Sequence, residues 1–84
     1  MQGNRDTWRY EVRNSQNEIV KIGITSDPDR REAEHRRDLG AEVNLHVQGP
    51  AVMRTSAEDW EQTRLEIYQR NHGGDLPPGN NIKR

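Results

Sequence analysis

Five side chains of this 84-residue chain have the chemistry that cleavage of a phosphate ester requires. Such cleavage needs a cation to neutralise developing charge, a carboxylate to hold a metal ion, and a group that orients or deprotonates water. The side chains that supply these functions are Tyr10, Lys21, Arg31, His35 and Glu61. Arg31 and His35 are four residues apart, so they share one face if their segment is a helix. None of these spacings is specific by itself, and Arg31 is equally interpretable as an ion-pair partner of Glu32 or Glu34.

The composition describes a small, charged protein with a thin core. Only 29% of the residues are hydrophobic, 32% are charged, and there is no Phe. A chain of this length accommodates one domain, which we expect to span residues 1–84. No apolar stretch approaches the ~20 residues that a bilayer span requires, so we expect no membrane insertion. The absence of Cys excludes disulfides and cysteine zinc sites.

The charge balance does not by itself indicate a polyanionic partner. Thirteen Lys and Arg residues face fourteen Asp and Glu residues, which gives a formal net charge of -1. Only Lys21 and Lys83 are lysines, so the other eleven basic residues are arginines. Arginine is the residue suited to bidentate contacts with phosphate, and this bias is consistent with phosphate chemistry.

Alternating residues predict an antiparallel hairpin near the start of the chain. Trp8, Tyr10 and Val12 alternate with charged residues, which predicts a strand over about residues 7–13. A polar turn follows, and the β-branched run over 19–25 predicts a second strand. Gly23 lies inside this second strand, where a glycine destabilises the strand unless the backbone must pass close to another group. Its position therefore points to a site.

Helix signals complete a β-β-α-β-α order. Thr25 or Ser26 is expected to cap a helix over about residues 28–38 that stops at Gly40. Alternation over 43–47 predicts a third strand, and a capping box at 55–58 predicts a helix to about residue 69. This order predicts an α/β (α+β) sandwich, with a small three-stranded mixed sheet and helices packed on it. We expect residues 1–6 to form a disordered start and 75–84 a C-terminal loop.

An ordered set of motifs resembles the GIY-YIG nuclease superfamily, as a compact URI-like domain. The set begins with Tyr10 on a strand and continues with an Ile-Gly pair at 22–23. It continues with Thr-Ser-Asp-Pro-Asp-Arg-Arg-Glu-Ala-Glu-His over 25–35, the most specific part. Glu61 lies where the family places its metal-binding Glu, and Asn80-Asn81 lie where it has an Asn. The resemblance covers about residues 8–82.

The chain departs from the family pattern in both name-giving motifs. The first reads Arg9-Tyr10-Glu11 rather than Gly-Ile-Tyr, so it keeps only the Tyr. The second reads Lys21-Ile22-Gly23 in place of Tyr-Ile-Gly, so the second tyrosine is missing. A lysine ammonium beside a phenol can depress the phenol pKa or hold the water, and whether Lys21 permits activity in place of the tyrosine stays open.

The resemblance implies a metal-dependent endonuclease that hydrolyses nucleic-acid phosphodiester bonds, and DNA is expected as its substrate ahead of RNA. Glu61 would hold one Mg2+ or Mn2+ ion that stabilises the leaving oxygen, and Arg31 would contact the scissile phosphate. Tyr10 with Lys21 would activate water, and His35 would transfer protons. Gly23 would let the backbone approach these residues. Further residues implied to complete the site or to contact nucleic acid are Arg30, Arg36, Arg37, Asn80 and Asn81.

The compact length and the Pro-Pro-Gly-Asn segment resemble nuclease domains of secreted bacterial polymorphic toxins. This likeness implies a cytoplasmic protein or one delivered into a target cell. An immunity protein would then be a partner.

Two other classes of function stay open. In the first, a GIY-YIG-like module that lacks the second tyrosine would bind nucleic acid and not cleave it. Alternatively, a small interaction domain would bind a protein, since a net charge of -1 does not favour unassisted binding of a polyanion.

Overall fold

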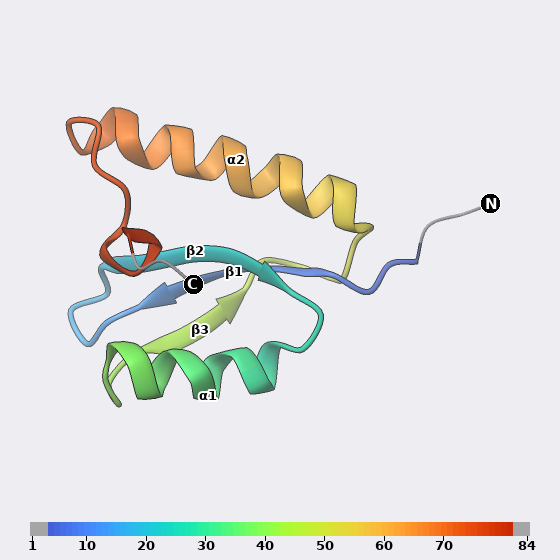
Figure 1. Ribbon diagram of the computed structural model, residues 1–84, viewed down its shortest axis with the longest axis horizontal. Helices are drawn as coiled ribbons and strands as arrows, with labels where there is room; N and C mark the ends of the chain where they lie inside the picture. Colours follow the sequence, from blue (N-terminus) through green and yellow to red (C-terminus); the bar gives the residue numbers. More distant parts are fainter. Residues whose placement is uncertain (1–3, 82–84) are drawn as a thin grey trace.

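The computed structural model describes residues 4–81, apart from the side chain of Asn81 (Figure 1). Two strands come first, β1 (Trp8–Arg13) and β2 (Ile19–Thr25), and helix α1 (Pro28–Leu39) follows them. Strand β3 (Asn44–Val47), helix α2 (Arg54–Asn71) and a short 3-10 helix, η1 (Pro78–Asn81), complete the described part. The predicted α+β class and the order β-β-α-β-α are confirmed. The segment expected as a C-terminal loop contains η1, and residues 1–3 and 82–84 lie outside the described residues.

The sheet is antiparallel throughout, so the expected mixed sheet is wrong. Its strand order is β2-β1-β3, with β1 in the centre and antiparallel to both neighbours. Helix α1 carries the chain back, so that β3 runs in the same direction as β2. However, β3 pairs with the far side of β1 and not with β2, and the two parallel strands never become neighbours. The hairpin predicted from the alternation occupies the expected positions, with Tyr10 opposite Gly23.

The two helices cover opposite faces of this sheet. Successive side chains of a strand point to opposite faces, so Tyr10 and Glu11 mark the two sides of β1. Tyr10 makes a hydrogen bond with His35 of α1, whereas Glu11 accepts one from Arg64 of α2. Figure 1 shows α1 and α2 on the two sides of the strands. The α1 face holds the main apolar cluster, whose members are Tyr10, Val12, Val20, Leu39, Val43 and Leu45.

Side chains cover part of both outer edges of the sheet. On the edge of β2, the Asn80 amide accepts a hydrogen bond from Ile22 N and donates one to Ile22 O, each at 2.9 Å. On the edge of β3, Glu32 Oε2 accepts a hydrogen bond from Leu45 N at 2.9 Å. An open strand edge is a template for pairing with another chain, and these contacts remove part of it. The η1 segment is therefore docked on β2.

Local capping differs in detail from the sequence expectations. The N-cap of α1 is Asp27, whose carboxylate accepts from Arg30 N at 3.2 Å, rather than Thr25 or Ser26. Thr25 instead accepts a hydrogen bond from Asp27 N and so shapes the turn before the helix. Helix α2 begins one residue before the expected capping box, after Met53, and no side chain caps it. Within residues 4–81, neither helix is long and apolar enough to cross a membrane.

Candidate functional site

A hydrogen bond between β1 and α1 lies at the centre of the candidate site. Tyr10 Oη lies 2.8 Å from His35 Nε2, and the two rings are tilted by 48°. Tyr10 is fully buried, at 0% exposure, while His35 is half-buried. A Cβ atom at Gly23 would lie 2.5 Å from Tyr10 Oη, so only glycine leaves room for this phenol. The close approach that the sequence suggests at Gly23 is thus an approach to Tyr10.

Lys21 comes from β2 on the same face of the sheet. It lies opposite Val12, two residues along from Tyr10, so its side chain leaves the sheet on the α1 side. The residue is buried, and Lys21 Nζ donates to Gly79 O of η1 at 3.5 Å. A Cβ atom at Gly79 would lie 2.6 Å from Val20 O, which explains why a glycine stands where η1 meets β2. The C-terminal turn thereby helps to hold Lys21 in place.

The environment of His35 keeps its imidazole neutral at neutral pH. The pKa of His35 lies below its ordinary value of 6.5, first because burial removes water from the charged form. The positive charges of Lys21 and Arg31 lower this pKa further, whereas Asp38 and Glu34 raise it in part. A neutral imidazole has one nitrogen that accepts a proton. At neutral pH, His35 is therefore present mainly with one unprotonated ring nitrogen.

Arg31 forms the outer part of the site together with His35. The two residues lie one helical turn apart on α1, and the Arg31 side chain is 31% exposed. Arg31 Nε lies 3.0 Å from Glu34 Oε1, an ion pair within the same helix. The site thus has two layers, with Arg31 and His35 toward solvent and Tyr10 and Lys21 beneath them.

The other arginines of α1 differ in what they hold. Arg36 donates to Val43 O and to Asn44 Oδ1, so it fastens α1 to the segment at β3. Arg37 is exposed and pairs loosely with Asp38 at 3.9 Å. Arg30 is exposed and shares Glu34 with Arg31. Contact with nucleic acid stays a prediction for all three, although Arg36 already has a structural role.

Glu61 lies on α2, the helix on the other face of the sheet. It is half-buried on α2, four residues after the buried Ala57 and three before Arg64, which places it on the sheet-facing side of that helix. Helix α2 packs against the face opposite Tyr10. The structure therefore brings together Tyr10, Lys21, Arg31 and His35, whereas a common site with Glu61 stays a prediction. Among the described residues, no group of three or more His, Asp or Glu side chains is placed to hold a metal ion.

Asn80 supports the site through the backbone. Its amide uses a donor and an acceptor on Ile22, the residue between Lys21 and Gly23. These two hydrogen bonds agree with the prediction that Asn80 fixes the site. They also occupy donor and acceptor groups of the amide that contact with nucleic acid would need. The Asn81 side chain lies outside the described residues. The Gly79 carbonyl was not singled out from the sequence, whereas Glu34 was named there as one of two ion-pair partners of Arg31, and the structure shows this pair.

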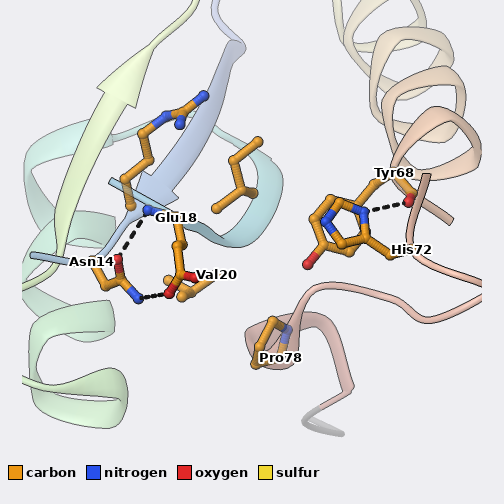
Figure 2. A pocket seen from close by; sticks show the side chains of 8 residues that line it. Asn14, Glu18, Val20, Tyr68, His72 and Pro78 are labelled. Carbon is orange, nitrogen blue, oxygen red and sulfur yellow. Dashed lines mark hydrogen bonds between the residues drawn. The ribbon is translucent and has the colours of Figure 1, made fainter. Parts of the chain in front are cut away.

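A cleft of about 440 Å3 lies elsewhere, between the hairpin turn and the end of α2 (Figure 2). The Tyr68 and His72 rings stack at 3.8 Å on one side of it, opposite Glu18 and Val20, and Pro78 lies below. His72 Nδ1 and Tyr68 O are 2.8 Å apart, which fixes the imidazole against the end of the helix. The lining of the cleft includes none of the four residues that the structure brings together, Tyr10, Lys21, Arg31 and His35.

Comparisons with known proteins identify no relative of this chain. The chain matches no protein-family model, no curated protein and no solved structure. The functional argument below consequently starts from the side chains and their geometry.

Proposed function

We propose that this protein hydrolyses phosphodiester bonds of nucleic acid and that His35 is its general base. The observation that carries the proposal is the 2.8 Å hydrogen bond between Tyr10 and His35. A base that is oriented by a second group is the recurring arrangement of general-base catalysis. The adjoining cations, Lys21 and Arg31, supply the charge that a phosphoryl transition state requires. Together these groups support phosphoryl chemistry better than a purely structural role.

His35, and not Tyr10, is the member of the pair that meets water. Tyr10 is fully buried, whereas His35 is half-buried and lies in the outer layer. If His35 Nε2 carries the proton and donates to the Tyr10 oxygen, Nδ1 is left as the proton acceptor. Tyr10 is then a positioning residue that fixes the tautomer and the ring. This assignment exchanges the roles that the family resemblance implies for these two residues.

The two cations differ in how they act on the phosphate. Arg31 is partly exposed, and its planar guanidinium can donate two parallel hydrogen bonds to phosphate oxygens. Lys21 is buried, so its charge acts through a medium of low effective dielectric constant. As His35 takes the proton of the attacking water, both charges favour the negative phosphorane that forms. The bond to the leaving oxygen then breaks.

Glu61 is the residue that would hold a divalent cation. A single carboxylate fits Mg2+ or Mn2+, because Mg2+ usually keeps several waters and binds one or two carboxylates together with substrate phosphates. A bound ion would supply charge stabilisation at the leaving oxygen if Glu61 and the four residues of the α1 face reach the same phosphate, and this common site stays a prediction. The part assigned to His35, Tyr10, Lys21 and Arg31 does not depend on where this ion sits.

A cleavage assay with two histidine variants tests the proposal. Purified protein is incubated with supercoiled plasmid DNA and with total RNA, in Mg2+ and in EDTA, beside a mock purification that controls for contaminating nuclease. We expect His35→Ala to lower the rate by about 100-fold to 10,000-fold, the usual contribution of a general base. His46→Ala removes an exposed imidazole from β3 and should leave the rate unchanged.

The remaining outcomes separate the other classes of function. Salt-dependent binding of nucleic acid without cleavage by the wild-type protein would favour a binding module. No binding to DNA or RNA would favour a protein-interaction domain. Cleavage that His35→Ala and His46→Ala reduce equally would contradict the role of His35. Cleavage of RNA alone, undiminished by EDTA, would instead indicate attack by the ribose hydroxyl.

A further inference from the structure

Two arginines at the start of α1 share one carboxylate. Glu34 Oε1 lies 3.0 Å from Arg31 Nε, and Glu34 Oε2 lies 3.4 Å from Arg30 Nε. Carboxylate and phosphate present similar pairs of oxygens to a guanidinium group. We propose that Glu34 occupies the place of a phosphate, and that a phosphodiester of the bound strand displaces it to contact Arg30 and Arg31 together. The identity of this ligand rests on the proposed function, whereas the shared carboxylate is a feature of α1 itself.

The exposure of the three side chains permits this exchange. Arg30 is 78% exposed, and the Arg31 and Glu34 side chains are 31% and 33% exposed. Ion pairs of this kind contribute little free energy, because water screens the charges and long side chains lose freedom when they pair. A phosphate that forms charge-assisted hydrogen bonds with two guanidinium groups can therefore replace the carboxylate. Glu34 meanwhile keeps both arginines close together before the ligand arrives.

Glu32, another acidic residue of α1, does not occupy a phosphate position in the way proposed for Glu34. Glu32 also pairs with an arginine, at 3.6 Å from Arg36. However, Glu32 Oε2 accepts the backbone N–H of Leu45 on the outer edge of β3. Displacement of Glu32 would leave that N–H without its partner, so this carboxylate is part of the fold. Within residues 4–81, the ion pairs of Glu34 are with Arg30 and Arg31 alone.

The position of the shared carboxylate places the ligand next to the candidate base. Glu34 directly precedes His35, and Arg31 lies one turn before it. These positions on α1 bring the charges of Arg31 and Glu34 close enough to act on the His35 imidazole. A phosphate bound between Arg30 and Arg31 would accordingly lie beside the general base. Glu34 is a positioning residue in this scheme, and it competes with the substrate.

Glu34→Gln and Glu58→Gln form a matched pair for the test. Each removes one negative charge from an arginine ion pair within a helix, and Arg54 Nε lies 3.2 Å from Glu58 Oε2 on α2. The first measurement is the Kd for a phosphorothioate oligonucleotide in EDTA, over a series of salt concentrations. We expect Glu34→Gln to bind about two to five times more tightly than Glu58→Gln at low ionic strength, the range that a weak competing ion pair allows. KM should fall with little change in kcat.

A second measurement uses the wild-type chain and inorganic phosphate. The NMR signals of the Arg30 and Arg31 Nε–H groups should shift on titration with phosphate, and the Arg54 signal should shift less. Equal affinities of Glu34→Gln and Glu58→Gln would overturn the inference, as would equal shifts at all three arginines. If phosphate shifts the Arg30 and Arg31 signals but no nucleic acid is cleaved, the shared site stands and the proposed nuclease function fails. If cleavage occurs and the two variants bind alike, the nuclease function stands and this inference fails.

Discussion

The two faces of the sheet bury charged and polar groups in different ways. On the α2 face, the Glu11 side chain is 4% exposed and pairs with Arg13 at 3.0 Å and with Arg64. On the α1 face, the buried residues Tyr10 and Lys21 lie beneath a half-buried imidazole. The first arrangement matches a carboxylate with two guanidinium groups. The second places cations next to a base.

This difference separates a cluster of compensated charges from the cluster that we propose to be reactive. Opposite charges that meet in a buried ion cluster compensate each other, and the cluster links β1 to α2. Cations beside a histidine instead lower its pKa, as they do for His35. Perturbed pKa values of this kind are typical of functional sites. The α2 face thus carries a compensated ion cluster, whereas the α1 face carries both the main apolar cluster and the candidate reactive group, His35.

Glu61→Gln is the change that could break this comparison, because it tests for chemistry on the α2 side. Glutamine keeps the size of the side chain and removes the charge that a hard cation needs. If Glu61 holds the metal ion, the rate of cleavage in Mg2+ should fall by about 100-fold to 10,000-fold. Affinity for nucleic acid should hardly change.

The control for Glu61→Gln is Glu66→Gln, at an exposed position of the same helix. Equal rates for Glu61→Gln and the wild type, with EDTA also without effect, would show that the α2 face takes no part in the reaction. The proposed chemistry would then be confined to the α1 face, and the difference between the two faces would be larger than proposed.

Glu11→Gln should separate stability from activity. It leaves Arg13 and Arg64 without the carboxylate that they share, and the free energy of unfolding should fall by about 2 to 3 kcal/mol. The rate of the folded enzyme should stay close to that of the wild type, because Glu11 faces away from His35. Urea denaturation and a cleavage assay below the melting temperature measure the two quantities. A large loss of rate in folded Glu11→Gln would contradict the division between the faces.

Asn80→Ala tests the support that η1 gives to the chemical face. Loss of the two hydrogen bonds to Ile22 leaves a backbone donor and acceptor without these partners, which should cost about 1 to 2 kcal/mol of stability. The rate should fall as well, because Gly79 of the same turn accepts from Lys21. Asn71→Ala, at an exposed position near the end of α2, is the control. If stability falls and the rate does not, η1 is part of the fold only.

Local periodicity was sufficient to predict the strands, the two long helices and the β1–β2 hairpin, but not η1 or the pairing of β3. The alternation around Tyr10 and the β-branched run before Thr25 predicted the hairpin, and Asp27-Pro28 marks the start of α1. The neighbour of β3 depends on where α1 returns the chain, which no local pattern encodes. The antiparallel sheet therefore could not be deduced from these segments.

The candidate site was predictable in its membership more than in its roles. Spacing placed Arg31 and His35 on one helical face, and alternation placed Tyr10 on one face of β1. Burial depends on tertiary packing, so the sequence could not show that Tyr10 lies beneath His35. Similarly, the contact between Asn80 and Ile22 joins residues 58 positions apart, and no periodicity reports such a contact.

The smallest expected effect is the pH dependence of stability that His35 contributes. Its pKa is lowered in the folded protein, so between that pKa and the ordinary value of 6.5 the unfolded chain binds more protons. The free energy of unfolding should therefore rise with pH across this window. The contribution is fully present above pH 6.5 and is lost as the pH falls through the folded-state value.

Urea denaturation between about pH 5 and 7.5 measures this slope, and His35→Gln should flatten it relative to His46→Gln. Lys21→Met removes one of the two charges that lower the pKa of His35, so the NMR titration midpoint of the imidazole should move to higher pH. Because burial is the larger cause, the midpoint should stay below 6.5 in this variant. A wild-type midpoint at or above that value would mean that the imidazole is more accessible to water than the Tyr10 hydrogen bond implies. His35 would then belong with the exposed histidines, and the chemical distinction between the two faces would be lost.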